Sequence, residues 1–283
     1  MTVFRDFIRR RLAVLHIRLL YQIASFSEPL HLGTYWYLMK SISRKNSRCS
    51  TDANQKALVH VHMTAFNAEH TIEQAIKSVI NQNHQNWNLV IIDDCSSDQT
   101  PQIIRSFQDS RITYFVRTEN QRQWANRNMA ISISLKQSSK PDFFTSIDAD
   151  DIAKPNWLSN SLELFATDSI IGIRPLIERV NYTTLQPLWS APACQQTMWR
   201  REVYETIGGY RTEIAASDSD FMNRARRLAI VNRQQILLST EKLQLMRNHP
   251  NSWSKQYTHK DKLFKDYSRS SNNGLFVPLE CQN

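Results

Sequence analysis

Residues 142–151 read Asp-Phe-Phe-Thr-Ser-Ile-Asp-Ala-Asp-Asp, and this stretch decides the predicted fold. Its apolar and aromatic middle is typical of a short buried strand. Three carboxylates, Asp148, Asp150 and Asp151, end the stretch, and Pro155 then indicates the start of a helix. Carboxylates this close repel one another unless a cation lies among them. The stretch therefore predicts a divalent-cation site with oxygen ligands, or else a polar loop that caps the next helix.

The chain before this stretch alternates between predicted strands and helices. Apolar residues at helical spacing predict a helix at 72–80. The predicted strands span 57–63, 89–92, 112–116 and 143–147, and further helices begin near 101 and 124. Strands and helices at this spacing form crossover units, so the predicted fold class is α/β with a mostly parallel sheet flanked by helices.

Polar clusters follow three of the predicted strands, at 64–67, 93–98 and 148–151. Ligands of open parallel sheets bind outside the carboxyl ends of the strands, so we expect these clusters to meet at one site. No glycine lies between Gly33 and Gly172, which excludes glycine-rich dinucleotide and phosphate loops from this half. Any nucleotide bound here is expected to be held by side chains, a metal ion and helix N-termini.

Length and composition are those of a folded protein with one large domain or two modest ones. The 283 residues are 41% hydrophobic and 22% charged. The four cysteines are far apart and lack Cys-x-x-Cys spacing. This pattern argues against a zinc site or a disulfide scaffold and indicates a reducing compartment, so a cytoplasmic location is expected.

The net charge of +9 is concentrated near the start of the chain. Residues 1–48 carry nine Lys/Arg and two acidic residues, a net +7, while the remaining residues carry a net +2. A nucleic-acid-binding face on the main domain is therefore not expected. The basic segment has apolar residues at helical spacing, which predicts an amphipathic helix. Such a helix binds the anionic inner face of the cell membrane, or packs on the main domain or a partner subunit. Neither a signal peptide nor a transmembrane helix is predicted.

Motifs in the order of the chain make this sequence similar to the family 2 glycosyltransferases. They are Met63-Thr64-Ala65-Phe66-Asn67-Ala68-Glu69, Ala75-Ile76-x-Ser78-Val79-x-x-Gln82, Asp93-Asp94-x-Ser96-x-Asp98, Asn120 with Arg127-Asn128, Ile147-Asp148-Ala149-Asp150-Asp151, Ile207-Gly208-Gly209-Tyr210, Ser217-Asp218-Ser219-Asp220-Phe221 and Arg247-x-His249-Pro250-Asn251-Ser252. The resemblance covers about residues 57–255. It implies the GT-A fold, a Rossmann-like α/β sheet, and inverting transfer from a nucleotide-sugar donor.

The sequence departs from the family pattern at several positions. Thr64 stands where proline is common, and Arg122 replaces a frequent glycine, so the backbone of that loop is expected to differ. Ser217 replaces the glutamate of a Glu-Asp pair, which puts an acceptor contact in doubt. A Gln-x-x-Arg-Trp motif is absent, which argues against a processive polysaccharide synthase.

The resemblance implies roles for individual residues. The residues implied in donor binding are Thr64, Phe66, Asn67, Glu69, Asp93, Asp94, Arg127 and Asp148. The implied metal ligands are Asp150, Asp148 and His249, with Mg²⁺ or Mn²⁺ as the ion, while Asp151 is expected to orient the loop. Asp218 is the implied general base, although Asp220 is a rival and an N-cap role would also explain Asp218. Trp189, Trp199 and Trp253 are candidates for stacking on sugars, with core packing expected for at least two of them.

These inferences combine into one prediction of organisation and function. Residues 1–55 form a basic helical extension and linker, 56–155 the nucleotide-sugar half, and 156–283 the acceptor half with a helical tail. The expected reaction moves a sugar, most readily from a UDP-sugar, to a glycan or lipid-linked glycan of a cell-surface polysaccharide. Two alternatives stay open: a degenerate, non-catalytic GT-A scaffold, and an aspartyl phosphatase that uses the Asp-x-Asp motif.

Overall fold

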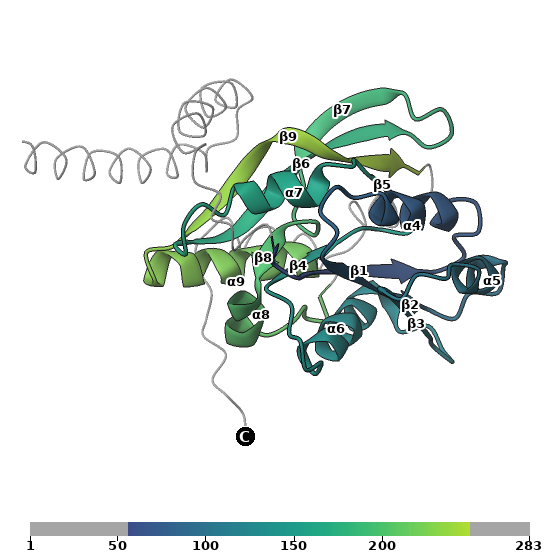
Figure 1. The fold of residues 1–283 in the computed structure, drawn as a ribbon, viewed down its shortest axis with the longest axis horizontal. Helices are drawn as coiled ribbons and strands as arrows, with labels where there is room; N and C mark the ends of the chain where they lie inside the picture. The colour runs from purple at the N-terminus through teal and green to yellow at the C-terminus, as the bar shows by residue number, and fades with distance from the viewer. Residues whose placement is uncertain (1–55, 215, 250–283) are drawn as a thin grey trace, which may run out of the picture. The chain divides into compact units, whose positions relative to one another are not determined.

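The computed structural model describes residues 56–214 and 216–249, in which one nine-stranded sheet is accompanied by six helices (Figure 1). The strands are β1 (Val59–Ala65), β2 (Trp87–Asp93), β3 (Ile112–Val116), β4 (Phe143–Ser146), β5 (Ile152–Ala153), β6 (Ile170–Asn181), β7 (Pro187–Pro192), β8 (Met198–Arg200) and β9 (Gln235–Asn248). The helices are α4 (Ile72–Ile80), α5 (Thr100–Arg105), α6 (Arg122–Leu135), α7 (Trp157–Glu163), α8 (Arg201–Ile207) and α9 (Ser217–Val231).

The sheet has the strand order β3-β2-β1-β4-β8-β6-β9-β5, with β7 paired to β6. The strands β3, β2, β1 and β4 pair in parallel, and so do β6 and β9. The remaining pairs are antiparallel: β4 with β8, β8 with β6, β6 with β7, and β5 with β9. The α/β class is confirmed, but the second half of the sheet is mixed. A short turn between β6 and β7 reverses the chain there, where a helical crossover would have kept the strands parallel.

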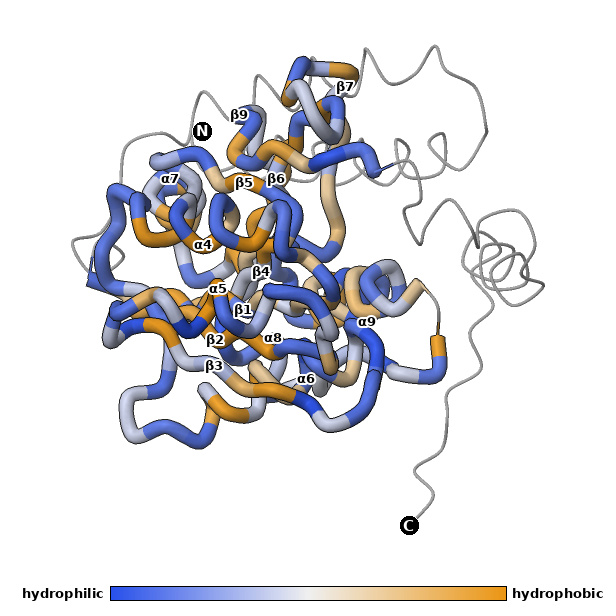
Figure 2. The backbone as a smooth tube through the Cα atoms, turned by 90° about the vertical axis from the view of Figure 1, so that its right-hand side faces the viewer, coloured by the Kyte–Doolittle hydropathy of each residue, from blue (hydrophilic) through white to orange (hydrophobic). Residues whose placement is uncertain are grey.

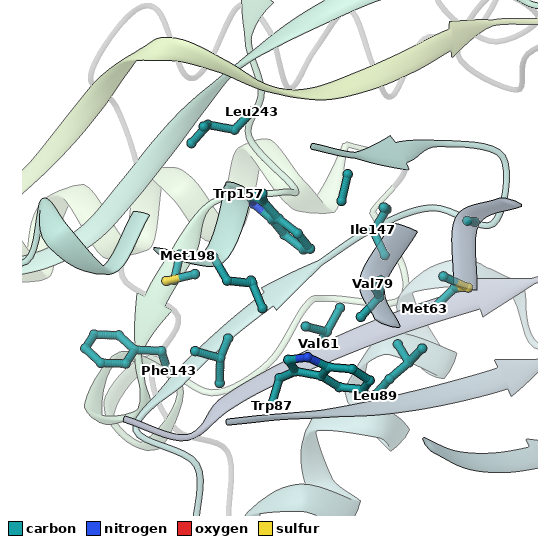
Figure 3. Close-up of a cluster of buried hydrophobic side chains, with 14 of the residues drawn as sticks. Val61, Met63, Val79, Trp87, Leu89, Phe143, Ile147, Trp157, Met198 and Leu243 are labelled. Carbon is teal, nitrogen blue, oxygen red and sulfur yellow. The ribbon is translucent and has the colours of Figure 1, made fainter. Parts of the chain in front are cut away.

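The two faces of β1 follow from its alternating sequence, because successive side chains of a strand point to opposite faces. Val61 and Met63 enter the main core together with Trp87 and Trp157, which come from β2 and α7 (Figure 3). The predicted apolar stripe of α4 is buried in the same core, as expected. The other face of β1 is covered by α6, and Figure 2 shows hydrophilic segments around these apolar strands.

The sheet brings the predicted polar clusters together at one edge. Because β1 lies between β2 and β4, the carboxyl ends of these three strands are neighbours. The backbone N–H of Asp94 donates to the carbonyl of Ala65 at 2.8 Å, and that of Ile147 donates to the carbonyl of His62 at 3.2 Å. The predicted meeting of the three clusters is therefore a consequence of strand order.

Several expectations fall on residues outside the described part. The basic extension over 1–55 and the tail from 250 onward, including Trp253, lie there. The expected division between 155 and 156 does not interrupt the sheet, since β5 from the first half pairs with β9 from the second. Among the described residues, no helix combines the length and apolar character needed to cross a membrane.

Candidate active site

Three carboxylates form the centre of the candidate site. One ligand oxygen from each of Asp148, Asp150 and Asp151 lies within 4.8 Å of the other two. Burial, followed by the charge of Asp148, raises the pKa of Asp150 to about 6. Burial also raises the pKa of Asp151, whose Oδ2 is buried without a hydrogen-bond partner. An all-oxygen ligand set with an unpartnered buried oxygen fits a hard divalent cation such as Mg²⁺ or Mn²⁺.

Asp148 is held from both sides by hydrogen bonds. Nη2 of Arg127 donates to its Oδ1, and Nε2 of Gln195 donates to its Oδ2. Gln195 lies between β7 and β8, and its carbonyl is fixed by the hydroxyl of Ser146 at 2.8 Å. In the described part of the chain, by contrast, no side chain donates to the carboxylate of Asp150. Asp150 is therefore the member of the cluster best prepared to bind a cation.

Arg247 holds the loop that carries the cluster. Its backbone N–H donates to Oδ1 of Asp151 at 3.0 Å, which agrees with the expected loop-orienting role of Asp151. Its guanidinium donates to the carbonyl of Asp150, to the carbonyl of Tyr182 at 3.2 Å, and to Oε1 of Gln74. Sequence analysis assigned Arg247 no role beyond its motif, because its partners are scattered over the whole chain.

His249 directly follows β9. Among the described residues, the group of side chains that could hold a metal consists of the three aspartates, and His249 is not a member. Its imidazole packs edge-on against Tyr182, with ring centroids 4.6 Å apart. The ligand role of His249 stays a prediction.

Asp93 supports the donor loop from within. The residue is fully buried, its Oδ1 accepts hydrogen bonds from the backbone and hydroxyl of Ser96, and its Oδ2 accepts one from the hydroxyl of Tyr114 at 3.2 Å. Burial, then the charge of Asp93, raises the pKa of Tyr114 to about 12. In the structure both oxygens of Asp93 accept hydrogen bonds from the protein, and its contact with a nucleotide stays a prediction.

Asp94 organises the neighbouring loop. Its two carboxylate oxygens accept the backbone N–H groups of Gln121 at 2.7 Å and Arg122 at 2.9 Å. Arg122 has a φ of 66°, in the left-handed region that favours glycine. The backbone at this position is therefore of the kind that favours glycine, although Arg122 occupies it. The bonds from Asp94 hold the strained residue in place.

Asn67 and Glu69 join the loops after β1 and β2. Oδ1 of Asn67 accepts the N–H of Ser97, and Oε2 of Glu69 accepts the N–H of Gln99, both at 2.9 Å. These two side chains therefore shape the predicted donor site by holding its walls. Phe66 precedes Asn67 in the chain, and its side chain is 53% exposed at this edge of the sheet.

Asp218 lies at the second position of α9, where the charges of Arg127 and Asp148 act on its carboxylate. The N-cap of α9 is Ala216, so an N-cap role does not explain Asp218. Burial raises the pKa of Asp218, the charge of Arg127 lowers it, and the charge of Asp148 adds to the rise. A half-buried carboxylate with a raised pKa, close to Asp148 and Arg127, is suited to accept a proton.

The rival Asp220 is occupied by an ion pair. Its side chain is 2% exposed and bonds to Nε of Arg224 at 2.8 Å and Nη1 of Arg211 at 3.5 Å. The neighbouring Ser217 is fully buried, and its hydroxyl has no hydrogen-bond partner. Of the two acidic residues in the first turn of α9, Asp218 is therefore the one that remains available to a substrate.

Two histidines of β1, His60 and His62, are fully buried, and the charge of Arg127 acts on His62. His60 is fully buried, with Nδ1 2.7 Å from the hydroxyl of Ser134, and burial lowers its pKa to about 4. Burial, then the charge of Arg127, lowers the pKa of His62 well below its usual value. Both imidazoles are neutral, so Arg127 carries the positive charge of this buried layer. Its Nε and Nη1 have no hydrogen-bond partner.

The similarity of this chain to a known protein family extends over most of the candidate site. The sequence profile described as Glycosyl transferase family 2 matches residues 60–234. The chain is 36% identical over 104 residues to a putative colanic acid biosynthesis glycosyl transferase, WcaA, of Escherichia coli K12, covering 36% of each chain. It is 36% identical over 107 residues to the UDP-Glc:alpha-D-GlcNAc-diphosphoundecaprenol beta-1,3-glucosyltransferase WfgD of E. coli, covering 38% of this chain and 39% of that one. The matched part is thus well under half of each relative.

Solved structures share the fold. A mannosyltransferase from Pyrobaculum calidifontis, in complex with GDP-Man and Mn²⁺, superposes with a TM-score of 0.65 at 15% identity, covering 88% of this chain and 74% of that one. Residues 1–349 of TarS from S. aureus, in complex with UDP-GlcNAc, superpose with a TM-score of 0.61 at 16% identity, covering 75% and 64%. At these identities the likeness concerns the fold alone.

Proposed function

The chain belongs to glycosyl transferase family 2, and from that premise we propose that it transfers a sugar from a nucleotide-diphosphate sugar to a hydroxyl of a glycan or lipid-linked glycan. The named relatives act in the synthesis of colanic acid and on a diphosphoundecaprenol-linked sugar. We accordingly place the product in a cell-surface polysaccharide. The observation that carries the proposal is the group of three carboxylates that follows β4, one of which accepts a hydrogen bond from the buried Arg127.

The proposed donor site spans the edge formed by β1, β2 and β4. The exposed ring of Phe66 offers a stacking surface for a base, and Thr64 and Asp94 border it. Bases stacked on aromatic side chains gain about 1–3 kcal/mol each. Two structural neighbours are complexes with UDP-GlcNAc and GDP-Man. Here we propose a UDP-sugar as the donor.

Asp150, with Asp148 and Asp151 beside it, is the proposed holder of Mg²⁺ or Mn²⁺. When bound, such an ion supplies Lewis-acid stabilisation of negative charge on phosphate oxygens. Two donor atoms of Arg127, Nε and Nη1, are buried without a hydrogen-bond partner, and its third nitrogen donates to Asp148. This guanidinium is proposed to stabilise the charge that develops on the leaving diphosphate.

Asp218 is the proposed general base. It takes the proton from the acceptor hydroxyl as that oxygen attacks the anomeric carbon from the face opposite the nucleotide diphosphate. The C–O bond to the diphosphate breaks, and the configuration at the anomeric carbon inverts. Base assistance of this kind contributes about 10²–10⁴ in rate.

Neither alternative gains support from the geometry. An aspartyl phosphatase would need a nucleophilic oxygen on the first aspartate of the motif, yet both oxygens of Asp148 accept hydrogen bonds from Arg127 and Gln195. A non-catalytic scaffold was suggested by Ser217, but the adjacent Asp218 keeps an environment suited to a base.

Cys95 provides a direct test of the donor site. Its thiol is exposed in the loop between Asp94 and Ser96. If a nucleotide binds there, UDP with Mn²⁺ should slow alkylation of Cys95 by iodoacetamide, measured by peptide mass spectrometry. Alkylation of Cys194 serves as the internal control. Equal labelling with and without UDP, together with no transfer from a panel of UDP-sugars, would contradict the proposal.

A further inference from the structure

The hairpin of β6 and β7 places a cation against an exposed aromatic ring. Arg179 and Trp189 are paired across the hairpin, and the guanidinium carbon lies 5.6 Å from the centroid of the indole. The side chain of Trp189 is 54% exposed, whereas Trp199, another candidate for sugar stacking, is buried in the core. In Figure 1 this hairpin extends past β5 at the top of the view.

The base of the hairpin is tied to the loop of the acidic cluster. Arg179 pairs with Met246 of β9. The next residue, Arg247, donates through its guanidinium to the carbonyl of Tyr182, which follows β6, and to the carbonyl of Asp150. The segment that carries Arg179 therefore lies beside the cluster.

Of Arg127, Arg179 and Arg247, Arg179 is the one whose guanidinium donates no hydrogen bond to any residue in the described part of the chain. Arg127 is bonded to Asp148, and Arg247 donates to three oxygens of the loop. Arg179 has a buried Nε without a hydrogen-bond partner, and among the described residues no acceptor is bonded to its guanidinium. Unpartnered buried donors are costly, so this side chain is prepared for an anionic ligand.

The pair lies outside the loops proposed to bind the base. These loops follow β1 and β2, whereas β6 is separated from β1 by β4 and β8 in the sheet. The chain leaving β7 after Trp189 leads to Gln195, which bonds to Asp148. The hairpin is therefore tied to the cluster without being part of the base-binding edge, which leaves it to the second substrate, the acceptor.

We propose that Arg179 and Trp189 form an acceptor subsite for a lipid-linked sugar carried on a diphosphate. The guanidinium binds the diphosphate through parallel N–H···O bonds, and the indole covers the apolar surface beside it. This inference rests on the proposed function and names the chemical class of its acceptor.

The test is a calorimetric titration of the full chain with citronellyl diphosphate and, separately, with citronellol. The protein is first saturated with UDP and Mn²⁺, so that the donor site is filled. The wild type should bind the diphosphate about tenfold more tightly than the alcohol, the expected scale for a charge-assisted contact. Arg179→Gln should bring this ratio close to one, and Arg179→Lys should retain part of it. Trp189→Ala should weaken both ligands.

Leu188→Ala is the matched control, because Leu188 is 49% exposed on the same strand and should leave both affinities unchanged. Thermal midpoints check that every variant is folded. Equal affinities of the wild type for the two ligands, or an unchanged ratio in Arg179→Gln, would overturn the subsite. So would a loss of UDP affinity in the variants as large as the loss of diphosphate affinity. Failure of UDP to bind the wild type would instead count against the proposed function, and the two lipids are then compared without UDP.

Discussion

The guanidinium of Arg127 is buried and donates a hydrogen bond to Asp148, so the positive charge of this arginine neutralises one carboxylate of the acidic cluster. In the described part of the chain, neither Asp150 nor Asp151 has such an ion pair with an arginine, and burial raises the pKa of both. The pairing of Arg127 with Asp148 divides three neighbouring aspartates into one that is anchored and two that are prepared for a cation. The following predictions depend on this division.

Replacing Arg127 should destabilise the fold. Arg127→Met leaves Asp148 without its main counter-charge, and breaking such a pair costs about 2–4 kcal/mol, less than for a fully buried pair because Asp148 is 25% exposed. Lys77→Met, which removes the exposed pair with Glu73, should cost under about 1 kcal/mol. Urea unfolding measures both. Equal costs for the two variants would show that the Arg127 pair is not a structural anchor.

Gln195 should position Asp148 for the donor. Gln195→Ala removes one of the two bonds that aim the carboxylate. We expect the KM for the nucleotide sugar to rise about tenfold with a smaller change in kcat, since loss of one such bond costs about 1 kcal/mol or more. Gln195→Glu should be worse, because it places a second negative charge against Asp148. Gln186→Ala, at an exposed position of the hairpin, is the control.

The metal-free protein should lose stability as the pH rises. The pKa of Asp150 is about 6 in the fold against 3.8 ordinarily, so between these values the folded chain holds a proton that the unfolded chain has released. Stability should therefore fall by about 2–3 kcal/mol from pH 4 to pH 6.5 in EDTA. Asp150→Asn should flatten the curve, and Mn²⁺ at pH 7 should restore stability. A wild-type curve that rises over this range would contradict the assignment.

Asp150 should also make nucleotide binding depend on the metal. UDP is expected to bind the wild type more tightly with Mn²⁺ than with EDTA, because a divalent cation held by Asp150 would attract the negatively charged phosphates. Asp150→Ala should abolish this difference. Calorimetry with the two proteins, with and without Mn²⁺, gives the four affinities. Equal affinity of the wild type in EDTA and Mn²⁺ would remove the metal from the proposal.

Asp218→Asn should separate chemistry from binding. A base acts on the acceptor, so UDP affinity should stay unchanged while transfer falls by about 10²–10⁴. Because the pKa of Asp218 is raised, the wild-type pH–rate profile should show an acid limb above the ordinary value of 3.8, and the variant should lack it.

Asp220→Asn is the matched comparison, and the ion pair with Arg224 changes what it should do. The expected loss is in stability, about 2–3 kcal/mol, because a nearly fully buried pair is broken. Transfer measured well below the unfolding midpoint should remain within a few-fold of wild type. Dead enzyme in this variant, with near-normal transfer by Asp218→Asn, would move the base to Asp220.

The basic segment, residues 1–48, should affect binding to anionic membranes and not the rate of sugar transfer. Deleting residues 1–48 removes a net charge of +7. Each basic residue near an anionic surface contributes about 1 kcal/mol at most, so sedimentation with anionic vesicles should fall sharply. Turnover of a soluble acceptor should change little. Unchanged sedimentation would exclude this segment as the membrane attachment.

Much of the fold was accessible from local patterns. The apolar stripe of α4, the continuous apolar runs of β2 and β3, and the acids after β4 were all predicted close to their observed places. These features depend on periodicity within one segment, which a sequence shows directly. The family motifs then predicted which strand ends carry the site.

The sequence by itself therefore determined the fold class, the edge of the sheet where the site lies, and the residues gathered there. The division of labour among those residues was decided by tertiary structure. Asp93 became a buried support, Asp220 the acid of an ion pair, and Asp148 an anchored carboxylate, while Gln195 and Arg247 entered the site unpredicted. Except for Asp220, whose partner Arg224 is four residues away, these outcomes depend on a partner far away along the chain. A carboxylate's burial and charge neighbours set its pKa and its freedom to bind, and these are properties of packing that no local pattern contains.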